Sequence, residues 1–419
     1  MWDPYAEFES TVLSNGLTVH AAHWPGRPWE SIGFLIHSGA EHDPVGLEGL
    51  AHFVEHLVGN NAPIPQEDLS TFFDDCGGNV DLGATGYPNT EYTCFVPIDD
   101  AILGKAFSLL GETLLSSRLE QCVEAQRTVI LAEFHREYPR ALPFELDRHK
   151  AKMLYDGSWL ERFVAPLGSP DSIKRITQED LQLSYDRHYT PKNMSIVAVG
   201  GLTVSALVQL LSESPFAMHK DGARTPFPVP VSNVAPPSQT RHVINVSEHM
   251  TTSSPLEVGG YESVGKLPGT IHRSTVTIVR RLLQQALFQE VRGCRSWAYD
   301  ISCHTCNFRH LYQFAIVCYG LELQALPTIE QVVDGVIASV GEREDLFDQM
   351  KRQMIASVFM VDTTAAGVRD SAMNELIGHQ RIRSLAEDLR SFEQVSMTDV
   401  RNVLDWLRPD RRWTQITQP

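Results

Sequence analysis

The sequence predicts an α+β protein made of two duplicated domains, each an antiparallel-rich β-sheet flanked by α-helices. Three observations lead to this prediction. The 419 residues exceed what a single hydrophobic core usually organises. Short apolar and β-branched runs alternate with long helical patterns, in a similar order in both halves of the chain. Residues 395–400, Val-Ser-Met-Thr-Asp-Val, also echo residues 176–181, Ile-Thr-Gln-Glu-Asp-Leu.

The first half is expected to start with strands and to continue with helices. The Asn15-Gly16 pair predicts a hairpin turn within residues 11–20, and residues 31–37 form a further strand. A helix is expected within residues 47–59, because apolar positions recur there at helical spacing. The next elements, in order, are a helix over 66–76, two strands bracketing 81–90, helices over 99–118 and 119–137, a short helix opened by residues 177–180 and a buried strand over 194–200.

Residues 217–240 separate the two halves. This segment contains several prolines and has no helical period, so it is expected to be a linker between a first domain, residues 1–216, and a second, residues 241–419. The second domain is expected to contain strands over 241–246 and 257–261, a helix over 270–291, strands around 297–303 and 312–319, and helices over 328–340 and 346–360.

Composition excludes several classes of function. The formal net charge is −17 and there is no cluster of Lys and Arg, which argues against nucleic-acid binding. No apolar run approaches the roughly 20 residues of a membrane span, and the N-terminus lacks a signal-peptide pattern, so no membrane partner and a cytoplasmic location are expected. The acidity predicts a well-solvated surface, or a chamber that favours basic or neutral peptides.

Cysteine usage gives no disulfide framework. Seven cysteines at irregular spacing in a long chain favour reduced thiols. The stretch Cys303-His304-Thr305-Cys306 could be a redox or zinc motif, but its alternation is more typical of a strand.

The stretch His52-Phe53-Val54-Glu55-His56 is the strongest candidate for chemistry. On a helix, positions 52, 55 and 56 share one face, because residues three and four apart are neighbours. Two neutral imidazoles one turn apart can bind one Zn²⁺, and a carboxylate beside them can act as general base. The alternative is a pair of structural histidines on a half-buried helix. The order His-x-x-Glu-His is that of the inverzincins.

Zinc peptidases need a third protein ligand and an open position for water. Glu133 lies on the helix expected over residues 119–137, 77 residues after His56. With this spacing the chain resembles the pitrilysin or insulin-degrading-enzyme family of metallopeptidases, in its short two-domain form. The resemblance implies that His52, His56 and Glu133 are the zinc ligands and that Glu55 is the general base.

One position departs from the pattern of that family. Seven residues before the third ligand the family usually has a second glutamate, and this chain has Gln126. A glutamine keeps hydrogen bonding but removes a negative charge near the metal. Gln126 therefore either orients a ligand from outside the coordination sphere or weakens activity.

Two further stretches carry the resemblance. Residues 77–93 resemble an edge-strand region that could add a peptide substrate as an extra strand, or could be an ordinary hairpin. In the second half Arg292 and Tyr299, seven residues apart, match an arginine and a tyrosine that bind substrate and stabilise the transition state in the family. The second half has no His-x-x-Glu-His on its corresponding helix, so the metal chemistry is expected in the first domain only.

The resemblance thus implies a zinc-dependent endopeptidase that hydrolyses peptides or a peptide precursor in a closed chamber. The alternative is a non-catalytic or weakly active member that serves as a scaffold or regulatory subunit of a peptidase heterodimer. Because one chain carries both the metal motif and the Arg292 and Tyr299 pair, a homodimer is expected, with a related unlike subunit as the second possibility.

Overall fold

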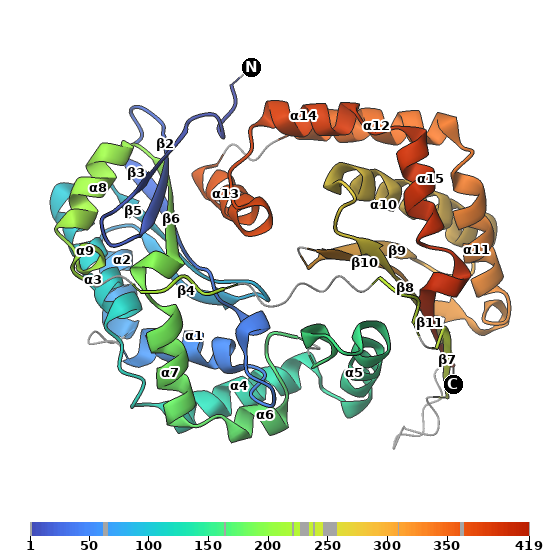
Figure 1. Cartoon of the computed structure of the whole chain (residues 1–419), viewed down its shortest axis with the longest axis horizontal. Coiled ribbons are helices and arrows are strands. Elements are labelled where there is room, and N and C mark those ends of the chain that lie inside the picture. Colours follow the sequence, from blue (N-terminus) through green and yellow to red (C-terminus); the bar gives the residue numbers. More distant parts are fainter. Residues whose placement is uncertain are drawn as a thin grey trace. The chain divides into compact units, whose positions relative to one another are not determined.

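The computed structural model of the chain describes residues 2–61, 66–162, 165–219, 222–226, 234–237, 239–245, 258–308, 310–360 and 364–418. It divides into two compact units, each with its own sheet (Figure 1). Unit 1 consists of Met1–Phe144, Arg162–Pro228 and Val361–Leu385. Unit 2 consists of Glu145–Glu161, Val229–Met360 and Ala386–Pro419.

Unit 1 contains a six-stranded sheet in the order β1-β2-β6-β3-β5-β4. Its strands are β1 (Phe8–Val12), β2 (Thr18–His23), β3 (Trp29–Ile36), β4 (Asn79–Thr85), β5 (Thr90–Pro97) and β6 (Met194–Gly200). Neighbouring strands are antiparallel except β2 and β6, which are parallel. The hairpin predicted at Asn15-Gly16 joins β1 to β2, and Gly16 has a positive φ of 87° that suits glycine. β4 forms one edge of the sheet.

Unit 2 repeats this connectivity in a five-stranded sheet, β7-β11-β8-β10-β9. Its strands are β7 (Arg241–Asn245), β8 (Val258–Pro268), β9 (Ser302–Asn307), β10 (Leu311–Glu322) and β11 (Arg412–Gln418). β7 and β11 are parallel and the other neighbours antiparallel, as β2 and β6 are in unit 1. If β1 is left out, the two sheets have the same topology: the first strand of each unit lies next to the last, followed by the second, the fourth and the third. The predicted α+β class with two duplicated domains is confirmed.

Helices cover the first face of the unit 1 sheet and form the largest core there. They are α1 (Leu50–Asn61), α2 (Gln66–Asp75), α3 (Asp100–Leu115), α4 (Val123–Glu137), α6 (Pro170–Arg175), α7 (Gln178–His188), α8 (Val204–Ser212) and α9 (Pro215–Met218). From β3 the side chains of Ile32, Phe34 and Ile36 enter this core, as expected when successive residues of a strand point to opposite faces.

The second face of the unit 1 sheet is covered by α13 (Ala365–His379), a helix from near the C-terminus (Figure 1). Leu35 of β3 lies in a cluster with Met373 of α13, on the opposite face from Phe34. The helix approaches so closely that a Cβ at Gly33 would lie 2.3 Å from the Met373 sulfur. Both faces of β3 are therefore buried, which agrees with the uninterrupted run without polar side chains over residues 32–36.

Unit 2 is organised in the same way. Its first face is covered by α10 (Arg273–Phe288), α11 (Ile329–Val340), α12 (Glu344–Val358), α14 (Leu385–Glu393) and α15 (Met397–Asp405). The other face is covered by α5 (Ala141–Tyr155), where Leu154 packs with Val264 and Trp413. Each unit thus includes one helix from outside the residue range expected for its domain: α13 in unit 1 and most of α5 in unit 2. Parts of the linker expected over 217–240 and of the strand expected over 257–261 lie outside the described residues.

Some elements begin at other residues than predicted. The helix expected from Leu119 begins at Val123, because Cys122 adopts the left-handed conformation with φ of 57°, which a continuing helix cannot contain. The strand expected from Trp297 begins at Ser302 and contains Cys303 and Cys306. All seven cysteines are free. No helix among the described residues is both long enough and apolar enough to cross a membrane.

Candidate metal centre

Helix α1 is fixed by its buried face and by a carboxylate at its N-terminus. Phe53, Val54, Leu57 and Val58 are at most 1% exposed and lie in the core of unit 1. The carboxylate of Asp43 accepts hydrogen bonds from the backbone N–H groups of residues 49, 50 and 51, at 2.8, 3.1 and 2.9 Å. These bonds satisfy donors that have no partner within the helix and suit the positive end of its dipole. The remaining face carries the polar residues 52, 55 and 56.

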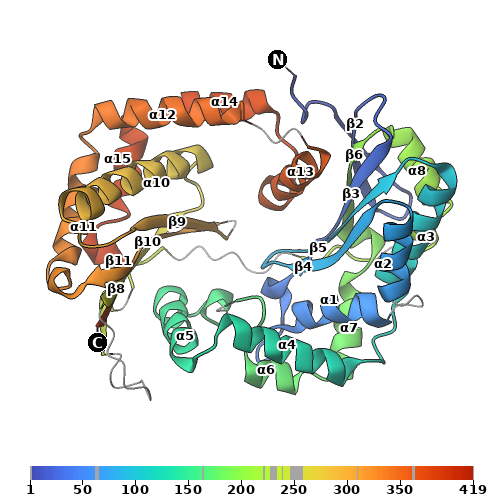
Figure 2. The same ribbon diagram turned by 180° about the vertical axis from the view of Figure 1, so that it is seen from behind.

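Helix α4 lies beside α1 (Figure 2) and is held there by Arg127. The Arg127 guanidinium donates to the backbone carbonyls of Ile173 and Ile176, which flank the end of α6. The same group lies 5.1 Å from the centre of the Phe53 ring on α1. One arginine thus ties α4 to two neighbours, and this packing brings Glu133 to the polar face of α1.

Three potential ligand atoms converge between these helices. Nε2 of His52 and Nε2 of His56 are 3.2 Å apart, and Oε2 of Glu133 lies 3.6 and 3.4 Å from them. Two ligands of a tetrahedral zinc, each about 2.1 Å from the ion, would be separated by about 3.4 Å. The triangle therefore has the dimensions of one face of a zinc site. Among the described residues, His52, His56 and Glu133 form the group of three His, Cys, Asp or Glu side chains whose ligand atoms lie close enough to share one metal ion.

Glu55 lies beside the triangle. Its Oε2 lies 4.0 Å from Nε2 of His52 and accepts a hydrogen bond of 3.1 Å from the Thr85 hydroxyl on β4. Gly83 of the same strand packs against this carboxylate, since a Cβ there would lie 2.5 Å from Oε1 of Glu55. Burial raises the pKa of Glu55 to about 8; the Thr85 hydrogen bond opposes this rise and the Glu133 carboxylate adds to it. A bound dication would favour the carboxylate form.

The two histidines are suited to be neutral ligands. Burial, with the nearby His56, lowers the pKa of His52 to about 3, so its imidazole is neutral at physiological pH. Nδ1 of His56 lies 3.3 Å from the Gln126 amide oxygen. An N–H donated from Nδ1 to that oxygen leaves the lone pair of Nε2 free for a metal. Nδ1 of His52 is buried with no hydrogen-bond partner among the described residues.

The triangle opens into a cavity of about 770 Å³. Its lining consists of His52, Glu55, His56, Gly83, Ala84, Thr85, Val129, Ala132, Glu133, Arg136, Pro166 and Leu167. The side chain of Glu133 is 28% exposed, whereas those of His52 and Glu55 are each 10% exposed. Water and substrate can therefore reach the open side of the triangle, and the edge strand β4 forms part of the cavity wall.

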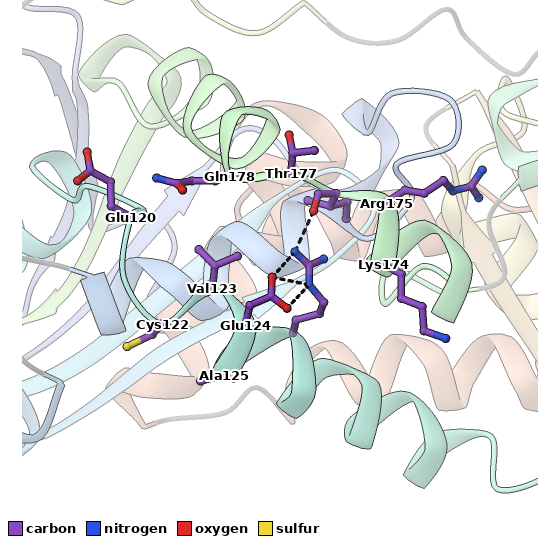
Figure 3. Close-up of a pocket in the computed structure, with 11 residues that line it drawn as sticks. Glu120, Cys122, Val123, Glu124, Ala125, Lys174, Arg175, Thr177 and Gln178 are labelled. Atoms are coloured by element: carbon purple, nitrogen blue, oxygen red, sulfur yellow. Dashed lines mark hydrogen bonds and ion pairs between the residues drawn. The ribbon is translucent and has the colours of Figure 1, made fainter.

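A second cavity, of about 620 Å³, lies at the N-terminal end of α4 (Figure 3). Glu124 lines it and forms an ion pair of 3.1 Å with Arg127. Glu124 is thus directed away from the metal cluster and cannot replace the glutamate that the family has at position 126. Two residues away from position 126 on a helix, Glu124 faces a different direction, which agrees with this arrangement.

Arg292 and Tyr299 lie together in unit 2. Arg292 is in a π-helical turn, Gln289–Cys294, that follows α10. Its guanidinium lies 4.4 Å from the centre of the Tyr299 ring and 5.0 Å from that of Phe288. Tyr299 is 80% exposed, so the phenol is available to a binding partner.

The predicted residues His52, Glu55, His56, Gln126 and Glu133 thus meet at one site. Sequence reasoning missed Thr85, Gly83, Asp43 and Arg136. Thr85 and Gly83 belong to residues 77–93, which were expected to be either an edge-strand region or an ordinary hairpin, but their contact with Glu55 depends on how β4 packs against α1. Asp43 lies too far before α1 for the local rules of helix capping to find it.

Comparison with known proteins identifies the family. The profile described as Insulinase (Peptidase family M16) matches residues 18–144, and the one described as Peptidase M16 inactive domain matches residues 175–354. A protein named uncharacterized zinc protease from Mycobacterium bovis is 26% identical over 425 residues, which cover 98% of this chain and 92% of that protein. The mitochondrial-processing peptidase subunit beta of Neurospora crassa is 28% identical over 229 residues, covering 54% of this chain and 45% of that protein.

Solved structures agree on the fold. A protease from Helicobacter pylori has a TM-score of 0.82 at 17% identity, with 100% of both chains covered. A putative M16-like peptidase from Alicyclobacillus acidocaldarius has a TM-score of 0.79 at 19% identity, covering 99% of this chain and 98% of that one. Peptidases of the M16 family use zinc, the cofactor expected from the sequence. The predicted resemblance is confirmed: the chain belongs to the insulinase family of peptidases, family M16.

Proposed function

We propose that this chain is a zinc-dependent endopeptidase that hydrolyses peptides or a peptide precursor inside a closed chamber. The observation that carries the proposal is the triangle of ligand atoms from His52, His56 and Glu133, whose edges of 3.2 to 3.6 Å suit one zinc ion. The position of Glu55 beside it supports the role of general base. The relatives named zinc protease support the reaction class.

In the proposed mechanism, Nε2 of His52, Nε2 of His56 and Oε2 of Glu133 would hold the ion. When bound, zinc lowers the pKa of a water molecule and polarises the peptide carbonyl. Glu55 accepts the proton of the attacking water and later donates it to the leaving amine. The hydrogen bond from Thr85 to Oε2 keeps the Glu55 carboxylate in place between these two transfers.

The rival proposal is a non-catalytic or weakly active subunit of a peptidase heterodimer. Gln126 favours it, because the glutamate that the family usually has at this position is missing. The match to proteins named subunit beta of the mitochondrial-processing peptidase is in keeping with a partnership of unlike chains. The hydrogen-bonding distance of 3.3 Å from Gln126 to His56 weighs against the rival, since the amide still serves the ligand.

Two variants test the assignment of base and ligand. Glu55→Gln should keep about one zinc per chain and lose most turnover, because an amide cannot accept the proton of water. Glu133→Gln should instead lose zinc affinity, because a neutral amide is a poorer zinc ligand. Zinc content by elemental analysis and cleavage of a mixed peptide library are measured on the same preparations. Equal zinc retention by both variants, or no peptide cleavage by the zinc-loaded wild type, would contradict the proposal.

We further propose a homodimer in which Arg292 and Tyr299 of one chain complete the metal site of the other. The exposed Tyr299 phenol, held against the Arg292 guanidinium, suits a donor to a developing oxyanion. Glu55→Gln and Tyr299→Phe are each expected to be nearly inactive. Mixed dimers of the two should regain activity, because one of their two sites combines intact Glu55 with intact Tyr299. A monomer at working concentration, or no recovery after proven subunit exchange, would exclude a shared site.

A cytoplasmic location belongs to the same proposal. All seven cysteines are free, and thiols persist in a reducing compartment. Fractionation of the source cells would decide between this location and an exported one.

A further inference from the structure

One side of the metal cavity is formed by a single face of α4. Val129, Ala132, Glu133 and Arg136 line it, at the three- and four-residue spacing that places side chains along one face of a helix. Glu133 is the proposed ligand and Val129 and Ala132 are apolar. Arg136 therefore contributes the permanent positive charge to the described lining of this cavity, whose other ionisable groups are His52, His56, Glu55 and Glu133.

The Arg136 guanidinium is mostly available for binding. Its side chain is 78% exposed, and among the described residues it makes one ion pair, from Nη2 to Oε1 of Glu133 at 3.5 Å. That distance is longer than a charge-assisted hydrogen bond, and an exposed pair of this kind contributes little stability. A guanidinium has five N–H donors in a planar fork, so most of them remain directed at solvent. The planar fork matches the geometry of a carboxylate.

The position of Arg136 places such a carboxylate next to the reaction. Oε2 of Glu133 lies 3.4 Å from Nε2 of His56, and Oε1 of the same carboxylate faces Arg136. The guanidinium is thus separated from the ligand triangle by the width of the Glu133 carboxylate group and the 3.5 Å between Oε1 and Nη2. The side chain of a substrate residue close to the scissile bond can therefore reach the Arg136 guanidinium.

We propose that Arg136 is a specificity-determining residue, and that the site prefers peptides with an aspartate or glutamate side chain close to the scissile bond. This inference rests on the proposed peptidase function and names its substrate class. A carboxylate of the substrate pairs with the N–H donors of Arg136 that face solvent, while the Glu133 carboxylate keeps its ion pair with the same guanidinium. This preference acts only at short range, through contact with Arg136. At long range the net charge of −17 disfavours acidic peptides.

The test uses quenched fluorescent peptides that differ at one position beside the cleaved bond. That residue is Glu, Gln or Lys, and every peptide is amidated at its C-terminus so that a terminal carboxylate cannot take the place of the side chain. For the zinc-loaded wild type, kcat/KM should be at least about tenfold higher for the Glu peptide than for the Gln peptide, mainly through a lower KM. Arg136→Gln should remove this difference, and Arg136→Glu should favour the Lys peptide.

Arg148 provides a matched control. It forms the same kind of i,i+3 pair with a glutamate, Glu145, and its side chain is 62% exposed. Arg148→Gln makes the same change in net charge and should leave the discrimination between peptides unchanged. Zinc content is measured for every variant, because a role of Arg136 in positioning Glu133 would lower zinc affinity and the rates for all peptides alike. That result would overturn the proposal.

Binding separates this inference from the peptidase proposal. The dissociation constants of the same peptides are measured by fluorescence anisotropy with the Glu55→Gln variant, with and without Arg136→Gln. Equal cleavage of the Glu and Gln peptides would exclude the role of Arg136 and leave the peptidase standing. If no peptide is cleaved, the peptidase proposal fails, and the binding data then decide: tighter binding of the Glu peptide that depends on Arg136 supports the assignment, and equal binding excludes it.

Discussion

The hydrogen bond from Thr85 to Glu55 is the contact whose loss should reveal how the proposed base is positioned. Thr85→Ala removes a donor that lies 3.1 Å from Oε2 of Glu55, a carboxylate with 10% of its side chain exposed. A hydrogen bond to a charged group contributes about 1.5–3 kcal/mol. If the bond is fully formed in the transition state, kcat/KM should fall by about 10- to 100-fold, at about 1.4 kcal/mol per decade.

The same variant should change the pH dependence of activity. The Thr85 hydrogen bond opposes the rise in the pKa of Glu55 that burial causes. Without the hydroxyl the pKa of Glu55 should be higher, and a higher pH should be needed to form the carboxylate of this proposed base. The acidic limb of kcat/KM should therefore move to higher pH, measured with a buffer series on zinc-loaded protein.

Thr85→Ser is the matched control, because it keeps the hydroxyl and removes only a methyl group. It should restore most of the activity and the wild-type acidic limb. Zinc content should be equal in the wild type and both variants, since Thr85 does not contact the ligand triangle. An alanine variant with wild-type kcat/KM and an unmoved acidic limb would refute the positioning role of Thr85.

Three other predictions concern the zinc affinity and the stability of unit 1. Gln126→Glu keeps an acceptor for Nδ1 of His56 and adds a negative charge near the ion, so zinc should bind more tightly in a chelator competition; an unchanged dissociation constant would contradict this. Burial raises the pKa of Glu30 to about 8 from 4.5, so its folded state binds a proton more tightly than its unfolded state. As the pH rises from 4.5 to about 8, the free energy of unfolding of the wild type should therefore fall by about 1.4 kcal/mol per pH unit relative to that of the Glu30→Gln variant. A difference between the two proteins that does not change with pH in urea titrations would contradict this. Asp43→Ala removes the acceptor at the N-terminus of α1 and should lower the free energy of unfolding by about 1–2 kcal/mol, whereas no loss would show that the cap is dispensable.

The sequence predicted the fold class because its signals are local. The Asn15-Gly16 turn, the alternating strands and the repeated order of elements each depend on short stretches of chain. The two helices on the second faces of the sheets, α5 and α13, could not be placed in this way. Their apolar residues, such as Leu154 and Met373, indicate a buried face, but which sheet that face covers is decided by tertiary packing.

The candidate site was predictable to the extent that it follows from residue spacing. The His-x-x-Glu-His order and the distance to Glu133 identify the cluster, and the contacts among its members fit that expectation. The contacts of Thr85 with Glu55 and of Arg136 with the cavity were not foreseen. The first joins β4 to α1 across 30 residues of chain. The second involves an exposed arginine, which in the sequence looks like any other charged residue on a helix.

The central claim is that His52, His56 and Glu133 hold a single catalytic zinc ion. The most direct measurement is anomalous diffraction at the zinc absorption edge from crystals of the zinc-loaded protein. One anomalous peak per chain is expected, about 2.0–2.2 Å from Nε2 of both histidines and from a carboxylate oxygen of Glu133. An anomalous map without a peak at this triangle, in crystals whose zinc content is proven, would contradict the account.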